Sequence, residues 1–203
     1  MKSGYSVIVF DLGNVLLPFN YNIMLERLDK IEKNLGQKFL NFYQNNYNIH
    51  RAFEKGKLSE EEFINIMLDN LDYKLDRETF CNYYSKIFIE NKDVTALLPE
   101  FKKNYSLVLL SNTNSIHKKY GWGDFNFIKY FDKLILSYEV RAYKPEEQIY
   151  KVVQDFTQKP SREHIFIDDV VEYSDTAKKL GWDAIHFTSY KNLVMEFKKR
   201  EIY

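Results

Sequence analysis

Acidic side chains follow two of the most hydrophobic short segments of this chain. Residues 6–10 form an apolar run that ends at Asp11, and the run over 164–167 ends at Asp168 and Asp169. Short apolar runs of this kind are typical of strands buried on both faces of a parallel sheet. Charges beside a buried sheet are costly unless they are paired or bind a metal, so we expect these carboxylates to share a site.

Three other polar residues suit the same site. Ser111 and Asn112 end the apolar run 107–110, and Lys144 lies just before an expected helix. Carboxylate oxygens are the ligands that Mg²⁺ prefers. A lysine offsets phosphate charge, and hydroxyl and amide groups hydrogen-bond to phosphate oxygens. The set therefore predicts a magnesium and phosphate site.

Each of these residues taken alone has a simpler interpretation. A strand-end Asp is often a turn residue or a helix cap, which applies to Asp11 and Asp168. Ser111 and Asn112 can simply terminate a strand, and an isolated Lys144 would be an ordinary surface lysine. The functional interpretation is favoured over these simpler ones because all of these residues are expected at one edge of one sheet.

The elements that must position these residues alternate between strands and helices. This alternation predicts an α/β fold with an open, doubly wound, Rossmann-like parallel sheet. Pro145 is placed for a first helical turn with Glu146 and Glu147 near its positive end, and Gly181 is placed to stop a helix over 171–180. The expected strands are 6–10, 107–110, 133–136, 164–167 and 184–187.

Residues 19–90 break this alternation and show only helical patterns. The apolar spacing over 24–35 predicts one helix that Gly36 stops. Ser59 with Glu62 forms a capping box, and Asp76 precedes a third pattern. We therefore expect a core domain of residues 1–18 and 91–203, and an all-helical cap of residues 19–90. An insertion there lies over the edge where open sheets bind ligands, so the cap is a candidate lid.

Four short motifs occur in a fixed order along nearly the whole chain. With them, the chain resembles the haloacid dehalogenase superfamily, with a helical cap of the C1 type after the first strand. Its Asp-Leu-Gly-Asn sequence is similar to a bacterial subgroup that contains an α-D-glucose-1-phosphate phosphatase. The motifs are residues 10–16, 110–114, 144–145 and 165–169.

The resemblance implies a role for each motif residue. Asp11 would be the nucleophile that forms an aspartyl-phosphate. Mg²⁺ would be held by Asp11, Asp169 and the backbone carbonyl of Gly13. Ser111, Asn112 and Lys144 would bind the phosphoryl group, with Lys144 also counted as catalytic. Asp168 and Asn14 would lie behind the metal ligands and orient their neighbours. The implied substrate is a small phosphorylated metabolite, with a sugar phosphate as one candidate.

Gly13 is the main departure from the pattern of this superfamily. Its phosphatases usually carry a second Asp there, which protonates the leaving alcohol and then activates water. General acid–base catalysis of this type contributes about a hundred- to ten-thousand-fold in rate. Two alternatives to a phosphatase therefore stay open: a catalytically weak or inactive phosphate-binding module, and a metal-free dehalogenase. The pair Asp168 and Asp169 argues against the dehalogenase.

The composition excludes several other classes of function. The 29 basic and 29 acidic residues balance, so nothing attracts nucleic acid or a membrane surface in bulk. Cys81 is the only cysteine, which is consistent with a reducing compartment. No run reaches the roughly 20 apolar residues of a membrane span. We expect a cytoplasmic protein that is a monomer or a weak homodimer.

Histidine and aromatic residues give no further functional prediction. His50, His117, His164 and His186 show no metal-ligand spacing. The aromatic residues that follow the second motif are expected to pack in the core, although they could wall a pocket. These are Tyr120, Trp122 and Phe125.

Overall fold

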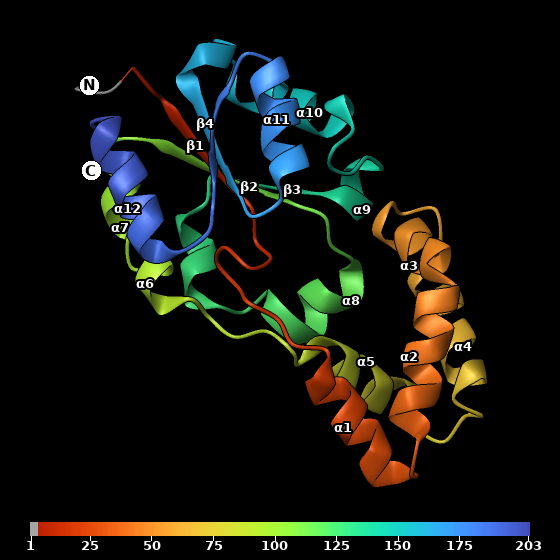
Figure 1. Ribbon diagram of the computed structural model, residues 1–203. Helices are drawn as coiled ribbons and strands as arrows, with labels where there is room; N and C mark the ends of the chain where they lie inside the picture. Colours follow the sequence, from red (N-terminus) through yellow and green to blue (C-terminus); the bar gives the residue numbers. More distant parts are fainter. Residues whose placement is uncertain (1–3) are drawn as a thin grey trace.

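The computed structural model describes residues 4–203, so residues 1–3 of the predicted core domain lie outside the described residues. Five parallel strands form one sheet in the order β3-β2-β1-β4-β5, which confirms the expected doubly wound α/β fold (Figure 1). Each strand lies within one residue of its predicted bounds. The strands are β1 Val7–Phe10, β2 Ser106–Ser111, β3 Lys133–Leu136, β4 His164–Asp168 and β5 Asp183–His186.

Both faces of the sheet are buried, which explains why its strands are continuously apolar. Ile8 and Phe10 of β1 belong to one core cluster, and Val7 and Val9 belong to another on the opposite face. Figure 1 shows one group of helices on each face. One face packs against α6 (Lys92–Thr95), α7 (Leu98–Phe101) and α12 (Tyr190–Lys199), and the other against α10 (Glu147–Thr157) and α11 (Val171–Lys179).

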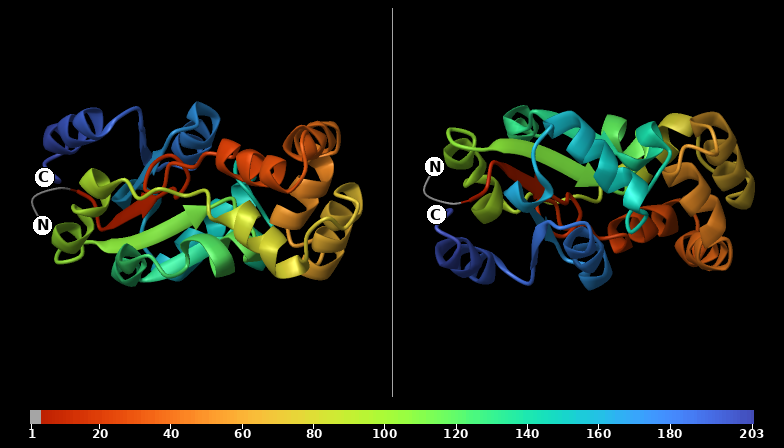
Figure 2. Two further views of the ribbon diagram at one scale, coloured as in Figure 1. Left: turned by 90° about the horizontal axis from the view of Figure 1, so that it is seen from below. Right: turned by 90° about the horizontal axis from the view of Figure 1, so that it is seen from above.

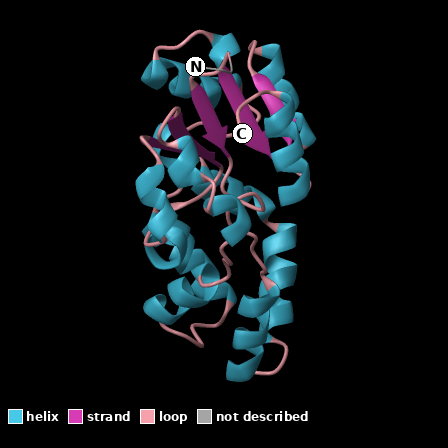
Figure 3. Cartoon of the chain, turned by 90° about the vertical axis from the view of Figure 1, so that its left-hand side faces the viewer, coloured by secondary structure: helices cyan, strands magenta, loops and turns pink. Residues whose placement is uncertain are grey.

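A bundle of helices fills the sequence between β1 and α6. It comprises α1 (Asn22–Ile31), α2 (Leu35–Asn45), α3 (Tyr47–Glu54), α4 (Glu60–Asn70) and α5 (Arg77–Ser85). Figure 3 shows the strands at one end of the molecule and only helices at the other, and Figure 2 shows the elongated outline. The bundle has its own apolar cluster, and Ile116 from the sheet domain also belongs to it. We refer to these five helices as the cap.

The predicted single helix over residues 24–35 is wrong. The structure ends α1 at Ile31 and starts α2 at Leu35, with Asn34 in the left-handed conformation between them. Gly36 therefore lies inside α2 rather than stopping a helix. A Cβ at Gly36 would come within 2.5 Å of the Leu25 carbonyl oxygen, so glycine is required by the close approach of the two helices.

Most other helix ends follow the sequence signals. The capping box of Ser59 and Glu62 begins α4, and Asp76 accepts a hydrogen bond from Thr79 N–H at the start of α5. Gly181 follows the end of α11 with a φ of +83°. The predicted helical turn at Pro145 is wrong, because α10 begins at Glu147, after the loop that carries Lys144.

The remaining short elements lie between the longer helices and strands of the sheet domain. Among residues 4–203, no helix is both long and apolar enough to cross a bilayer. The short elements are α8 (Ser115–His117), η1 (Lys118–Trp122), η2 (Asn126–Tyr130), α9 (Ser137–Val140) and η3 (Ser161–Glu163).

Candidate active site

The direction of the chain across the sheet reverses between β1 and β4. The strands from β1 to β3 run to one side, whereas β4 and β5 lie on the other. Asp11 follows β1, and its N–H donates to the Ile167 carbonyl of β4 over 2.9 Å. Open α/β sheets bind ligands at such a reversal, beyond the carboxyl ends of the strands. Asp11 and the end of β4 are therefore placed side by side by the topology alone.

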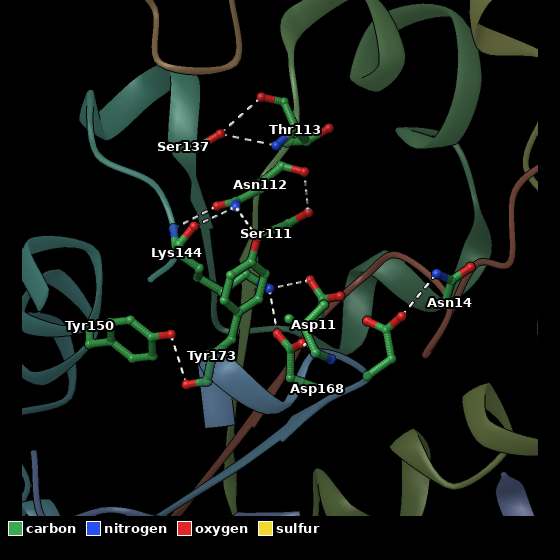
Figure 4. A network of polar contacts seen from close by, with 12 residues as sticks. Asp11, Asn14, Ser111, Asn112, Thr113, Ser137, Lys144, Tyr150, Asp168 and Tyr173 are labelled. Carbon is green, nitrogen blue, oxygen red and sulfur yellow. Dashed lines mark hydrogen bonds and ion pairs between the residues drawn. The ribbon is translucent and has the colours of Figure 1, made fainter. Parts of the chain in front are cut away.

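Lys144 lies between two carboxylates at this position (Figure 4). Its Nζ is 2.6 Å from Asp11 Oδ1 and 2.6 Å from Asp168 Oδ2. Only 1% of the Lys144 side chain is exposed, so the ammonium depends on these two partners. Asp168 Oδ1 also accepts a hydrogen bond from Val170 N–H, which uses its second oxygen.

The charged groups of this site shift one another's pKa values. Burial alone would lower the pKa of Lys144, but Asp11 and Asp168 outweigh it and raise that pKa above its ordinary value. Burial raises the pKa of Asp11, Lys144 opposes this, and the charge of Asp168 adds to the rise. One ammonium is therefore surrounded by more carboxylate charge than it balances. A bound cation would relieve this excess.

A third carboxylate completes a cluster of oxygen ligands. Ligand atoms of Asp11, Asp168 and Asp169 lie within 4.8 Å of one another. Asn14, in the left-handed conformation, donates its Nδ2–H to Asp169 Oδ2 over 2.9 Å. The Gly13 carbonyl accepts from Val15 N–H over 2.6 Å and keeps a second lone pair. The donor set consists of hard oxygens close together, which fits Mg²⁺.

Asn112 braces the loop that carries Lys144. Its Oδ1 accepts from Lys144 N–H over 2.8 Å, and its Nδ2 donates to the Lys144 carbonyl over 3.0 Å. The Asn112 side chain is thereby engaged, so any phosphate contact from this residue falls to its backbone N–H. Ser111 is 2% exposed and lies beside it at the end of β2.

Phe19 fills the space beside Gly13. A Cβ added at Gly13 would lie 3.3 Å from Phe19 Cε1 and 3.9 Å from Asp11 Oδ2. Gly13 is not among the residues with a left-handed φ, so its backbone does not require glycine. The position that usually carries an acid therefore faces an aromatic ring.

A pocket of about 190 Å³ opens between the sheet edge and the cap. The sheet domain contributes Gly13, Ser111 and Asn112 to its wall. The opposite wall consists of cap residues that the sequence did not single out. These include Tyr21, Tyr43, Tyr47, His50 and Glu54, and His117 from α8 lies beside them. The only local signal was that His50 and Glu54 share a helix face at spacing i, i+4.

The other sequence expectations have mixed outcomes. Trp122 and Phe125 belong to the sheet core and Tyr120 packs on the cap core, as expected. Burial lowers the pKa of His117 well below its ordinary value, and the nearby His50 adds to this, so the His117 ring is neutral. No histidine of residues 4–203 belongs to the carboxylate cluster described above. Arg141, three residues before Lys144, adopts a φ of +57°.

Comparison with known proteins gives a consistent family. The family model of haloacid dehalogenase-like hydrolases matches residues 8–187. A D-ribitol-5-phosphate phosphatase from Bacteroides thetaiotaomicron is 27% identical, over 87% of this chain and 88% of the relative.

Solved structures agree with this result. A HAD family enzyme from Bacteroides thetaiotaomicron, in complex with magnesium and inorganic phosphate, superposes with a TM-score of 0.77 at 25% identity. The match covers 91% of this chain and 94% of that one. A HAD-like family hydrolase from Porphyromonas gingivalis shares the fold, with a TM-score of 0.79 at 22% identity over 97% and 99% of the two chains.

Proposed function

We propose that this chain, which belongs to the haloacid dehalogenase-like hydrolase family, is a Mg²⁺-dependent phosphatase of a small phosphorylated metabolite. Sugar and polyol phosphates are the favoured substrates. The observation that carries the proposal is the buried Lys144 between Asp11 and Asp168, with Asp169 beside them. The similarity to a D-ribitol-5-phosphate phosphatase and to an enzyme solved with magnesium and phosphate supports it.

The reaction proceeds in two displacements at phosphorus. A carboxylate oxygen of Asp11 attacks the phosphorus, the bond to the ester oxygen breaks, and that oxygen takes a proton from water as the alcohol leaves. Water then attacks the aspartyl-phosphate, which releases inorganic phosphate and regenerates the Asp11 carboxylate. Lys144 holds Asp11 in place and balances the charge that gathers on the phosphoryl oxygens. Ser111 and the backbone N–H of Asn112 orient the same oxygens.

Asp11, Asp169 and the Gly13 carbonyl would hold the metal ion. When bound, Mg²⁺ would supply positive charge to the phosphoryl group and to the crowded carboxylates. Asp168 holds Lys144, and Asn14 holds Asp169, so both act by positioning a neighbour.

The test compares phosphate release by the wild type and by Asp11→Asn across a panel of phosphorylated metabolites with Mg²⁺. We expect Asp11→Asn to lose at least about a thousandfold in kcat, since it lacks the nucleophile. Asp175→Asn on the exposed face of α11 is the matched control and should retain the wild-type rate. Equal release by wild type and Asp11→Asn throughout the panel would refute the proposal.

A second candidate is a phosphate-binding module with little or no turnover. Phe19 beside Gly13 favours it, because no side chain at residue 13 protonates a leaving group. Calorimetry with phosphorylated ligands would then show binding without hydrolysis. Multiple turnovers on any member of the panel exclude this candidate.

A further inference from the structure

Within the described part of the chain, the pocket has a single carboxylate in its lining. Among residues 4–203, Glu54 is the one Asp, Glu, Lys or Arg side chain that lines it. The cationic Lys144 does not line the pocket; its backbone is hydrogen-bonded to Asn112, which forms part of the sheet-domain wall. A second anionic group on the substrate would therefore meet a carboxylate, not a cation. The pocket favours an organic part without negative charge.

Two hydrogen bonds and an ion-pair contact connect this carboxylate to the sheet domain. Asn114 Nδ2 donates to Tyr84 Oη over 3.4 Å, so the phenol proton is free to donate to His50 Nδ1, 3.0 Å away. The other ring nitrogen, His50 Nε2, is 3.2 Å from Glu54 Oε1. The series begins at Asn114, the last residue of the motif over 110–114, and ends on α3, so it connects the sheet domain to the cap.

The series uses only one of the two Glu54 oxygens. Oε1 faces His50, and Oε2 has no hydrogen-bond partner among residues 4–203. Burial raises the pKa of the Tyr21, Tyr43 and Tyr84 phenols, and the charge of Glu54 adds to each rise. The phenols around Glu54 therefore stay protonated. A carboxylate with a free oxygen, bordered by neutral rings, suits a ligand that donates hydrogen bonds and presents C–H faces.

We propose that Glu54 determines substrate specificity by accepting a hydrogen bond from a hydroxyl group of the substrate. The substrate class is a monophosphate of a neutral polyhydroxylated compound, a polyol or an open-chain sugar. This inference rests on the phosphatase activity proposed above. Asn114, Tyr84 and His50 act as positioning residues, because they hold Glu54 and do not touch the reacting atoms.

The experiment compares Glu54→Gln with the wild type on four substrates with Mg²⁺. Ribitol 5-phosphate carries hydroxyls, phosphoglycolate carries a second anion, phosphocholine carries a cation, and p-nitrophenyl phosphate carries none of these. We expect the wild type to prefer ribitol 5-phosphate over phosphoglycolate and phosphocholine. Glu54→Gln should raise KM for ribitol 5-phosphate by about tenfold or more, because the substrate hydroxyl loses a charged hydrogen-bond acceptor.

Controls separate specificity from folding. Glu54→Gln should keep the wild-type melting temperature and should lose less on p-nitrophenyl phosphate than on ribitol 5-phosphate. Glu61→Gln on the exposed face of α4 should keep the wild-type rate on both substrates. An equal loss on p-nitrophenyl phosphate and ribitol 5-phosphate would overturn the inference. So would a wild-type preference for phosphocholine that Glu54→Gln removes, because Glu54 would then recognise a cation.

Binding distinguishes failure of the inference from failure of the proposed function. If no substrate is turned over, the phosphatase proposal fails, and calorimetry with Mg²⁺ still tests the role of Glu54. The wild type should bind ribitol 5-phosphate more tightly than inorganic phosphate, and Glu54→Gln should lose that difference. Equal affinity of the wild type for both ligands would overturn the inference.

Discussion

Gly13 and Phe19 form a complementary pair beside the nucleophile. The Phe19 ring lies where a side chain at residue 13 would enter, yet 41% of Phe19 is exposed, so the ring has room to move. The Gly13 backbone also accepts other residues, since its φ is not left-handed. Phe19 therefore packs against Gly13, but the backbone does not require glycine there. An aspartate can be introduced at residue 13.

Gly13→Asp should raise kcat on alkyl phosphates such as ribitol 5-phosphate by about tenfold or more, because a general acid would protonate the leaving alcohol. The gain on p-nitrophenyl phosphate should be smaller, since p-nitrophenolate leaves without a proton. Steady-state phosphate release on both substrates measures the difference. Gly13→Asn is the matched control, with the same shape and no acid. Equal rates for the Asp and Asn variants would show that another group already donates the proton.

The strands could be predicted from the sequence, whereas the break between α1 and α2 could not. Both outcomes have a physical reason. A strand buried on both faces must be apolar throughout, as in residues 7–10, so its pattern survives without context. The helical spacing over 24–35 continues across the turn at Asn34, because residues of both α1 and α2 face the same cap core. Periodicity reports which residues are buried, and it does not report where the chain turns.

The same limit applies to Gly36 and Gly181, which the sequence predicts to end helices. Gly181 ends a helix with a positive φ, as predicted, whereas Gly36 serves a helix crossing. Both follow helical patterns, and only the packing of α1 against α2 distinguishes them. A mutation at Gly36 therefore tests the close packing of α1 against α2, which the sequence pattern did not predict.

Gly36→Ala should lower the free energy of unfolding by about 1–3 kcal/mol, because overpacking outweighs the better helix propensity of alanine. The added Cβ would lie 2.5 Å from the backbone oxygen of Leu25, which cannot move without displacing α1. Urea unfolding measures the loss. The exposed neighbour Gln37→Ala should change stability by less than about 0.5 kcal/mol. A Gly36→Ala protein as stable as the wild type would contradict the close crossing of these helices.

The site lies between the sheet domain and the cap region, which contact each other at several points. Lys55 Nζ of the cap lies 2.5 Å from Glu146 Oε1 of the loop before α10, and Ser115 Oγ donates to Glu60 Oε2 over 2.7 Å. Strand-end residues were predictable as a group because parallel strands end at one edge. Glu54 was not, because its place in the pocket depends on how the cap is seated on the sheet domain.

Magnesium should stabilise the whole fold, because it binds carboxylates that only the folded chain gathers. At about one hundred times its Kd, Mg²⁺ would add roughly 2.7 kcal/mol to the free energy of unfolding and raise Tm by about 5–10 °C. Differential scanning calorimetry with Mg²⁺, and then with excess EDTA, measures the rise and its reversal.

Asp169→Asn should lose most of this stabilisation, because Asp169 is the least buried member of the cluster and is held by Asn14 rather than by Lys144. The exposed Asp175→Asn on α11 should keep the full Tm rise. The measurement does not depend on turnover, so it tests the metal site separately from the proposed activity. A Tm rise of the same size in Asp169→Asn would place the magnesium ion elsewhere, and the carboxylates would then serve only to hold Lys144.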